Sequence, residues 1–187
     1  MTDYTFDWRE VWICGGGPSA ARLLPSVPDG ASVLAINDAV FHIRRLGRFG
    51  VAFFTLDKDW VRANRGWLAR FPGERHVALP LDTWPDCGGI PGVTYHGWSH
   101  AEGLSDDPAV VATGQNSGYG AINLCALKGS KVIHLIGYDM DTDYMRRYWA
   151  PFFAHALPQL DAAGVSVWNH NRDSQVKAFP FWEGNAA

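Results

Sequence analysis

The sequence has few charged residues and no long apolar run, and both shortages exclude classes of protein. Charged residues make up 19% of the 187 residues, and Lys plus Arg (16) are fewer than Asp plus Glu (19). A surface for duplex nucleic acid is therefore not expected, because such surfaces gather Lys and Arg. No apolar stretch reaches the roughly 20 residues that a membrane-spanning helix needs. The first residues lack the basic and apolar regions of a signal peptide, so we expect a cytoplasmic protein.

Cysteine is also scarce, with only Cys14, Cys87 and Cys125. This scattered set fits neither a disulfide framework nor a zinc motif, and no metal site is predicted from it. Cys14 and Cys125 lie inside apolar segments, where a thiol behaves as a small core residue. The sequence thus predicts a chain of a reducing compartment, with no tightly bound cofactor.

Hydrophobic residues, in contrast, make up 47% of the chain, which is typical of a globular protein. Short apolar runs that predict buried strands alternate with segments of helical spacing. The predicted strands are residues 10–14, 31–36, 51–56, 75–79, 131–136 and 165–168, and the predicted helices are 20–24, 39–46, 60–70, 114–128 and 143–163. The alternation predicts an α/β fold: one Rossmann-like domain over residues 1–187, with a mainly parallel sheet and helices on both faces.

Several boundaries of these elements have local signals. Asp59 is expected to cap the helix at 60–70, and Gly129 and Gly164 to end the two helices that precede them. Pro151 and Pro158 are expected to interrupt the helix at 143–163, and Ser174 to start a short terminal helix.

Residues 80–112 have prolines, glycines and acids with little periodicity, which predicts a long loop. Nine Trp residues in the chain are many, and aromatic side chains often line clefts. We therefore interpret this loop, which includes Trp84 and Trp98, as a lid or acceptor loop with a short hairpin near residues 93–95.

In an open parallel sheet, ligands bind beyond the carboxyl ends of the strands, and glycines or polar residues follow the predicted strands here. The first such turn comprises Gly15, Gly16, Gly17, Pro18 and Ser19. Glycine lets the backbone approach a phosphate closely, and the N-terminus of the following helix attracts an anion. The sequence predicts a nucleotide or phosphate site here, against the alternative of a tight turn without a ligand. Gly17→Val is expected to abolish binding while leaving the domain folded.

A second turn of small polar residues, Asn116, Ser117 and Gly118, also precedes a predicted helix. It is expected either to bind the nucleotide or only to cap the helix. Asn37 and Asp57 follow two other strands, and we place both in the nucleotide site, although Asp57 also suits a helix cap.

The candidate catalytic residues follow the last two predicted strands. Asp139 ends one strand and suits a general base, a ribose or metal contact, or a helix cap. Two further candidates are Tyr144 and Arg147, which have Arg146 and Tyr148 as neighbours. These side chains either donate hydrogen bonds to a leaving phosphate or form a solvated helix face. His170 is placed to act as a base or as a local hydrogen-bonding residue. Acids at 139, 141 and 143 leave magnesium possible.

Five motifs in order resemble a known group of proteins. They are Gly-Gly-Gly-Pro-Ser (15–19), Ala-Ile-Asn-Asp-Ala (35–39), Asn-Ser-Gly (116–118), Ile-Gly-Tyr-Asp (136–139) and Trp-Asn-His-Asn-Arg-Asp-Ser (168–174). The set is similar to bacterial lipooligosaccharide sialyltransferases. It also resembles motility accessory factor glycosyltransferases, 6-hydroxymethylpterin diphosphokinase-like proteins and uncharacterised phage proteins.

The sialyltransferase resemblance implies a CMP-sugar site made by the first glycine turn, Asn37 and residues 116–118, with Tyr144 or Tyr148 facing the phosphate. Where those enzymes have a catalytic His, residues 144–149 read Tyr-Met-Arg-Arg-Tyr-Trp, so the resemblance assigns no base. The pterin-kinase resemblance implies instead ATP and magnesium, with Asp57 and Asp139 near the metal.

Three functions follow as expectations. The first is a transferase that uses a nucleotide-activated donor, a glycosyltransferase with an acceptor that the sequence does not identify. The second is an ATP- and magnesium-dependent diphosphokinase. The third is a non-catalytic nucleotide-binding factor of a phage or its host.

Overall fold

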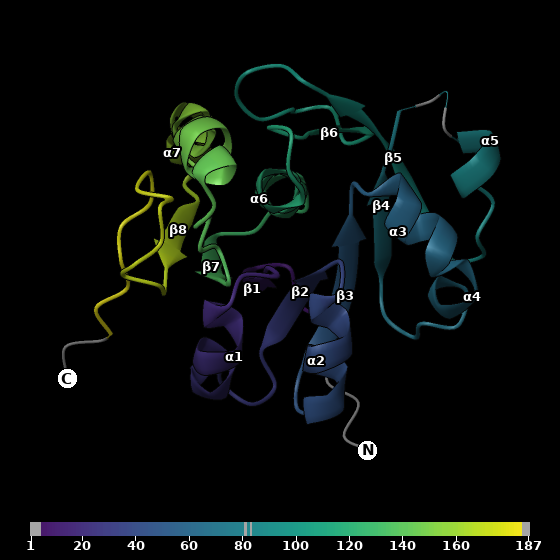
Figure 1. Cartoon of the computed structure of the whole chain (residues 1–187), viewed down its shortest axis with the longest axis horizontal. Coiled ribbons are helices and arrows are strands. Elements are labelled where there is room, and N and C mark those ends of the chain that lie inside the picture. The colour runs from purple at the N-terminus through teal and green to yellow at the C-terminus, as the bar shows by residue number, and fades with distance from the viewer. Residues whose placement is uncertain (1–4, 81, 83, 185–187) are drawn as a thin grey trace.

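Eight strands form one sheet in which every neighbouring pair is parallel, with the order β6-β5-β4-β3-β2-β1-β7-β8 (Figure 1). The computed structural model describes residues 5–80, 82 and 84–184, with the backbone alone at residues 84 and 85. The strands are β1 (Glu10–Cys14), β2 (Ser32–Ile36), β3 (Gly50–Thr55), β4 (Arg75–Ala78), β5 (Thr94–Ser99), β6 (Val110–Ala112), β7 (Val132–Ile136) and β8 (Ser166–Asn169). The predicted α/β fold with a parallel sheet is confirmed.

Helices cover both faces of this sheet. In Figure 1, α6 and α7 lie on one side of the sheet, and α1 and α2 lie on the other. The helices are α1 (Ser19–Leu23), α2 (Ala39–Leu46), α3 (Lys58–Ala63), α4 (Arg65–Leu68), α5 (Trp84–Cys87), α6 (Ser117–Leu127) and α7 (Leu157–Ala163), with 3-10 segments at Leu24–Ser26 and Pro151–Ala156 and a π-helical segment at Met145–Trp149.

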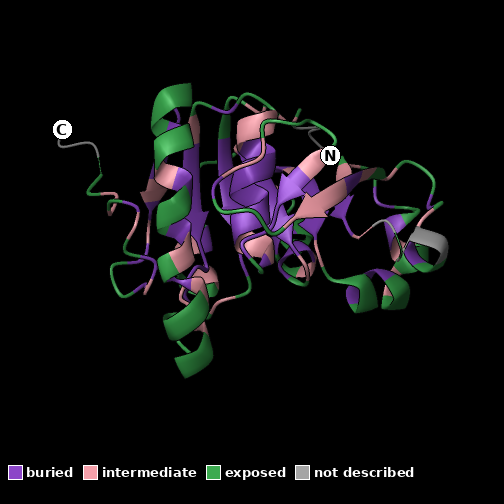
Figure 2. Ribbon diagram, turned by 90° about the horizontal axis from the view of Figure 1, so that it is seen from above, coloured by how far each residue is buried: buried purple, intermediate pink, exposed green. Residues whose placement is uncertain are grey.

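Each face of the sheet has its own apolar core. On one face, Val11 and Ile13 pack with residues of α6 and α7 such as Ile122 and Leu160. On the other face, residues of α1 to α4 pack on the alternate residues of the same strands. Buried residues therefore concentrate in the strands and on the inner sides of the helices (Figure 2). The inner strands β1, β2, β3 and β7 are mainly apolar because helices cover them on both sides.

The free thiols of Cys14, Cys87 and Cys125 are all buried, as was predicted for Cys14 and Cys125. Burial raises the pKa of Cys14 to about 12, so its thiol stays protonated at neutral pH. No helix of the described residues has the length and apolar character needed to cross a membrane.

The prediction of a long loop at 80–112 is wrong in part, because this segment provides the strands β5 and β6 and the helix α5. Residues 93–95 form no hairpin; Thr94 begins β5, which pairs in parallel with β4. The sequence Thr-Tyr-His-Gly-Trp-Ser of β5 lacks the apolar run of the inner strands, and β6 has three residues. Trp98 lies in β5, whereas the side chain of Trp84 lies outside the described residues.

Three smaller predictions also need correction. Asp57, not Asp59, caps the third helix, and that helix breaks at Asn64 into α3 and α4. Ser174 starts no helix; its hydroxyl donates to the backbone oxygen of Tyr138 at 2.5 Å. The predicted interruption near Pro151 is confirmed, since α7 is preceded by the π-helical and 3-10 segments.

Candidate ligand pocket at the centre of the sheet

The strand order reverses its direction at the centre of the sheet. From β1 the chain adds strands outward to β6, and α6 then carries it back to place β7 on the other side of β1. Ligands of open α/β sheets bind beyond the carboxyl ends of the strands at such a switch point. The first glycine turn follows β1, and Gly137 follows β7, so both stand at this position.

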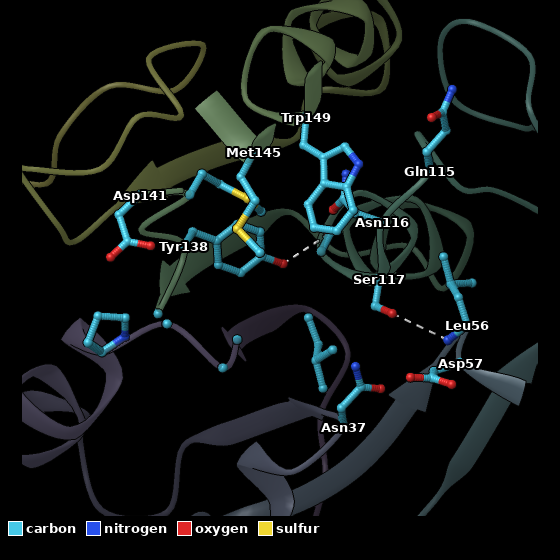
Figure 3. Close-up of a pocket in the computed structure, with 18 of the residues that line it drawn as sticks. Asn37, Leu56, Asp57, Gln115, Asn116, Ser117, Tyr138, Asp141, Met145 and Trp149 are labelled. Carbon is cyan, nitrogen blue, oxygen red and sulfur yellow. Dashed lines mark hydrogen bonds between the residues drawn. The ribbon is translucent and has the colours of Figure 1, made fainter. Parts of the chain in front are cut away.

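A pocket of about 540 Å³ opens at this switch point (Figure 3). Its lining comes from the carboxyl ends of the five strands β1, β2, β3, β5 and β7, from the start of α6 and from the π-helical segment. The lining residues are Gly15, Gly16, Gly17, Pro18, Ile36, Asn37, Leu56, Asp57, Trp98, Gln115, Asn116, Ser117, Gly118, Gly137, Tyr138, Met140, Asp141, Met145 and Trp149. Of the ten residues that the sequence assigned to the nucleotide site, all but Ser19 line this pocket.

Strained backbone also gathers at this pocket. Three non-glycine residues of the described chain have a left-handed backbone: Asn37 (φ 51°), Gln115 (φ 63°) and Met140 (φ 52°). All three line the pocket. Such conformations cost free energy and cluster at functional sites, so their convergence makes this pocket the candidate ligand site.

Asn37 presents a hydrogen-bond donor to the pocket. Its side-chain oxygen accepts from the hydroxyl of Thr55 at 2.6 Å, and this bond fixes the orientation of the amide. No described residue accepts from Asn37 Nδ2, because the only bond of this side chain is the one to Thr55. The Nδ2 group is therefore free to bind a ligand.

The first glycine turn is packed closely against the end of β7. A Cβ at Gly17 would overlap the carboxylate of Asp139 and lie 2.6 Å from the backbone oxygen of Gly137. A Cβ at Gly15 would lie 2.7 Å from the same oxygen, whereas one at Gly16 would meet nothing within 4 Å. The expectation that Gly17→Val leaves the domain folded therefore fails on steric grounds. Gly16 is the glycine of the turn that faces open space.

The N-terminus of α1 is occupied by a side chain of the protein itself. The amide and the hydroxyl of Ser19 both donate to the carboxylate of Asp139, the hydroxyl at 2.7 Å, and Asn171 Nδ2 donates to it at 2.9 Å. The amides of Gly15 and Gly17 donate to backbone oxygens of β7 and its following turn. Asp139 thus holds the place predicted for an anionic ligand, and α1 is only five residues long.

The N-terminus of α6, in contrast, is open toward the pocket. Asn116 is its N-cap: Asn116 Oδ1 accepts from the amide of Tyr119 at 2.8 Å, and Nδ2 donates to the oxygen of Gly114 at 3.0 Å. The first amides of a helix have no partner within it, and no described residue accepts from those of Ser117 and Gly118. Both residues line the pocket, where their amides and the helix dipole favour an anion.

One side of the pocket is apolar. Trp98, Met140, Met145 and Trp149 line it, and Figure 3 shows the Met145 and Trp149 side chains above the start of α6. The indole nitrogen of Trp149 is buried and has no hydrogen-bond partner among the described residues. These side chains offer flat contact area to a planar ligand.

Tyr138 forms the floor between the two glycine turns. Its hydroxyl donates to the backbone oxygen of Gly118 at 2.9 Å and ties the end of β7 to the start of α6. Burial raises the pKa of Tyr138 well above its usual range, so the hydroxyl keeps its proton. Tyr138 therefore serves as a fixed donor rather than as a base.

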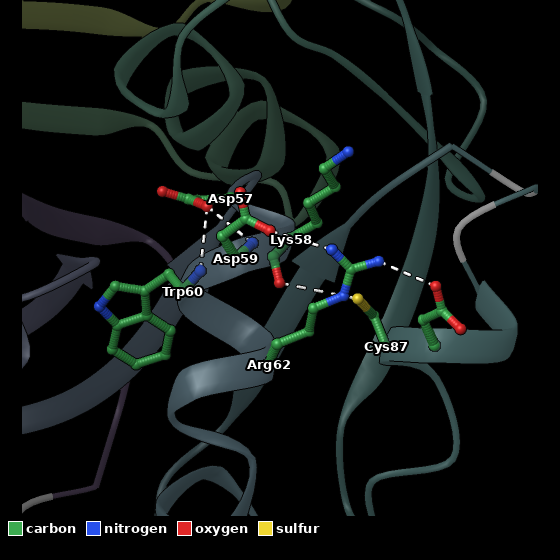
Figure 4. Close-up of polar contacts among 7 residues, drawn as sticks. Asp57, Lys58, Asp59, Trp60, Arg62 and Cys87 are labelled. Carbon is green, nitrogen blue, oxygen red and sulfur yellow. Dashed lines mark hydrogen bonds and ion pairs between the residues drawn. The ribbon is translucent and has the colours of Figure 1, made fainter.

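The charged residues that line the pocket are both acids. Asp57 caps α3, since its Oδ1 accepts from the amides of Asp59 (2.9 Å) and Trp60 (3.0 Å) (Figure 4). Figure 4 also shows Arg62, which bonds Asp59 and links α3 to Asp86 of α5. Asp141, the second acid, is exposed. No Lys or Arg of the described chain lines the pocket.

A magnesium site needs oxygen ligands that converge on one point. Figure 3 shows Asp57 and Asp141 on opposite sides of the pocket. No group of three or more His, Cys, Asp or Glu side chains within the described ranges is arranged to hold a metal ion. The acidic residues at 139, 141 and 143 do not converge either, because Asp139 is bonded to Ser19 and Asn171.

The four residues that the sequence named as catalytic all lie outside the pocket lining. Asp139 holds the start of α1, as described above. Tyr144 is exposed and stacks on Tyr148 at 5.0 Å, and Arg147 is exposed. His170 bonds His134 in a separate cavity, which shares no residue with this pocket.

Sequence reasoning missed Met140, Met145 and Trp149 as pocket residues. For Gln115 and Met140 the positive φ appears only in the structure, because neither residue type indicates it. Asp141 had a signal as one of three alternating acids, but the sequence grouped it with the wrong partners.

Comparison of the chain with protein-family models, with curated proteins and with solved structures finds no match.

Proposed function

We propose that the chain is a transferase that binds a nucleotide-activated donor, a nucleotide sugar, in the pocket at the centre of the sheet. The observation that carries the proposal is the open N-terminus of α6, where the amides of Ser117 and Gly118 have no partner among the described residues. They line the pocket at the place where doubly wound sheets bind nucleotides. A phosphate accepts hydrogen bonds from two adjacent amides of this kind.

The charge of the pocket favours a donor with little phosphate charge. Its charged lining residues are Asp57 and Asp141, and no Lys or Arg of the described chain offsets them. The amides and the dipole of α6 supply about half a positive charge. This suits the single phosphodiester of a CMP-sugar, whereas the triphosphate of ATP carries several negative charges. The pocket therefore supports a glycosyltransferase better than a diphosphokinase.

The remaining lining supplies the other contacts that such a donor needs. Trp98 and Trp149 offer ring surface for a base, and Asn37 Nδ2 is a donor without a partner among the described residues. In the reaction, an acceptor hydroxyl attacks the anomeric carbon, and the bond from that carbon to the phosphate oxygen breaks. Both carboxylates of the lining are exposed, but Asp57 caps α3, so Asp141 is the one we assign to take the hydroxyl proton.

A thermal-shift series tests this proposal. The chain is heated with CMP, UDP, ADP, ATP and nucleotide sugars, each with and without magnesium. A ligand at 100 times its Kd stabilises the folded state by about 2.7 kcal/mol, which raises the Tm of a domain of this size by roughly 5–11 °C. We expect CMP-sugars or CMP to give the largest shift without magnesium. A shift with ATP only in the presence of magnesium would favour the diphosphokinase, and no shift with any nucleotide would contradict the proposal.

Ser117→Pro tests the role of the amides directly. Ser117 is the first residue of α6, where Pro is tolerated, and Asn116 before it has extended φ and ψ (−149°, 150°) that suit a following Pro. The variant loses one amide but keeps the helix. We expect nucleotide affinity to fall about tenfold, since a charge-assisted hydrogen bond contributes roughly 1.5–3 kcal/mol.

Ser117→Ala is the matched control, because it removes only the hydroxyl, which accepts from the amide of Leu56 at 3.4 Å. Its affinity should stay within about twofold of the parent's, given how weak so long a hydrogen bond is. Equal affinity of the Pro and Ala variants would contradict the proposed phosphate contact. Release of CMP from a CMP-sugar, followed by chromatography, then separates a transferase from a factor that binds without turnover.

A further inference from the structure

A second cavity, of about 520 Å³, lies on the sheet away from the nucleotide pocket. It is lined by residues of β1, β7 and β8, of the segment after α1 and of the C-terminal segment. These are Glu10, Trp12, Ser26, Pro28, Val132, His134, Trp168, His170 and Trp182. None of them lines the pocket at the centre of the sheet, and the proposed transfer reaction uses none of them.

A chain of three side chains forms one wall of this cavity. Glu10 Oε1 lies 3.0 Å from His134 Nε2, and His134 Nδ1 lies 3.0 Å from His170 Nε2. The ring of Trp12 stacks on His134 at 4.2 Å and fixes its plane. The side chain of Glu10 is 64% exposed, so one carboxylate oxygen remains accessible.

The order of these contacts fixes the proton positions on the rings. The carboxylate of Glu10 accepts, so His134 Nε2 carries a proton and, in the neutral ring, Nδ1 accepts from His170 Nε2. His170 Nδ1 is then an acceptor, and no described residue donates to it. Burial and the neighbouring His134 lower the pKa of His170 to about 4, which keeps the ring neutral at physiological pH.

A second hydrogen-bonded series of one Glu and two His side chains has only a structural role. Glu74 Oε2 lies 3.1 Å from His76 Nε2, and His76 Nδ1 lies 3.1 Å from His96 Nε2. There, however, the last ring nitrogen, His96 Nδ1, lies 3.3 Å from the backbone oxygen of Pro108. In the series that begins at Glu10, the last ring nitrogen, His170 Nδ1, has no protein partner among the described residues and faces the cavity.

Aromatic side chains form the rest of the wall. Trp168 and Trp182 meet edge to face at 5.2 Å, and Trp182 lies 5.9 Å from the ring of His170. The amide of Trp182 donates to the oxygen of Asn169 at 3.0 Å, which holds the C-terminal segment beside β8. The aromatic wall is thus fixed in place before any ligand binds.

We infer that this cavity is a binding site for a small organic cation with N–H donors, an amine or a guanidinium. Its lining combines the carboxylate of Glu10, the acceptor His170 Nδ1 and the faces of tryptophans, and no Lys or Arg is part of it. A cation is attracted to a carboxylate and to aromatic faces, and its N–H groups match the free acceptors. A neutral sugar would match the acceptors and the ring faces but would leave the negative charge of Glu10 unused.

The test follows the indole resonances of the 15N-Trp-labelled full chain during titration with agmatine, which has a guanidinium and an amine. The resonances of Trp12, Trp168 and Trp182, assigned by single Trp→Phe variants, should shift and saturate. Those of Trp98 and Trp149 should not move. Methyl glucoside serves as the neutral probe.

Glu10→Gln keeps an oxygen near His134 but removes the charge, so we expect it to weaken agmatine binding at least tenfold, about 1.4 kcal/mol. Glu102→Gln, which removes an exposed carboxylate near His155, is the matched control and should bind as the parent does. Trp182→Leu, on the C-terminal segment, should also lose binding, and its Tm shows whether the fold persists. Saturable shifts with methyl glucoside alone, shifts with neither probe, or unchanged agmatine affinity in Glu10→Gln would each overturn the inference.

Discussion

The two turns that border the pocket at the centre of the sheet look alike in the sequence but differ in what their backbone donors bind. In residues 15–19 the amides of Gly15, Gly17 and Ser19 all donate within the protein, the last of them to Asp139. In residues 116–118 the amides of Ser117 and Gly118 have no acceptor in the described part of the chain. In the first turn only the amide of Gly16 has no acceptor among the described residues, whereas the second turn has two adjacent free amides at the start of a helix. A glycine-rich turn by itself does not tell which of the two it is.

Gly17→Ala tests this comparison with the largest expected loss of stability. The added methyl group would overlap Asp139 and the oxygen of Gly137, so the end of β7 would have to move away from the turn. We expect a loss of about 3 kcal/mol, at the upper end for overpacking, and thermal denaturation should show a Tm lower by roughly 6–12 °C. A Tm within 2 °C of the parent's would show that the turn is not packed as described.

A smaller loss is expected from Asp139→Asn. The variant keeps one oxygen but loses the charge that accepts from Ser19 and Asn171 at 2.7 and 2.9 Å. Hydrogen bonds to charged groups contribute roughly 1.5–3 kcal/mol, and we expect about 2 kcal/mol by urea denaturation. Nucleotide affinity, measured by calorimetry, should stay within about threefold. A larger loss of affinity with unchanged stability would make Asp139 a ligand-binding residue instead.

Asn116→Ala removes the N-cap of the open turn. Loss of such a cap typically costs about 1 kcal/mol, which should lower the Tm by roughly 2–4 °C. Asn116→Asp is the companion variant. It keeps Oδ1 as the acceptor for the amide of Tyr119 and adds a negative charge beside the free amides of Ser117 and Gly118. Its Tm should also fall, because a carboxylate oxygen replaces the Nδ2 group that donates to Gly114, and its affinity for nucleotides, but not for uncharged nucleosides, should fall. Equal losses for both ligand types would count against a phosphate at α6.

The smallest effect is expected from Gly16→Ala, the control for Gly17→Ala. A Cβ at this position meets nothing within 4 Å, and the residue does not have a left-handed backbone. The change in the free energy of unfolding should be below about 0.5 kcal/mol, as for surface substitutions. A loss as large as that of the Gly17 variant would mean that glycine is required throughout the turn for its conformation rather than for its packing.

The inner strands could be predicted from the sequence because the physics behind them is local, whereas the strand order that creates the switch point was not predicted. Strands that are covered on both faces must be apolar throughout, and the segments of β1, β2, β3 and β7 are. The strands β5 and β6 could not be predicted in this way. They lie toward one edge of the sheet, and their residues do not form an apolar run. Residue types at the strand ends and at the start of α6 likewise predicted nine of the 19 residues that line the pocket, because every parallel strand has its carboxyl end at the same rim.

The catalytic assignments were less predictable because they depend on contacts between distant segments. Asp139 is a structural cap only because Ser19 and Asn171, at sequence separations of 120 and 32, reach its carboxylate. His170 leaves the rim because its ring turns toward His134. Met145 and Trp149 enter the pocket from a π-helical segment, which neither residue type indicates.

The position of β1 between β2 and β7 has a consequence for synthesis on the ribosome. One edge of β1 is paired soon after it emerges, since β2 follows within a few tens of residues, but the other edge must await β7. Asp139, which secures that side, is made 120 residues after Ser19. At 5–20 residues per second this leaves the edge unpaired for roughly 6–24 s. During this interval the nascent chain presents an apolar strand edge, which is the kind of surface that aggregates or recruits chaperones.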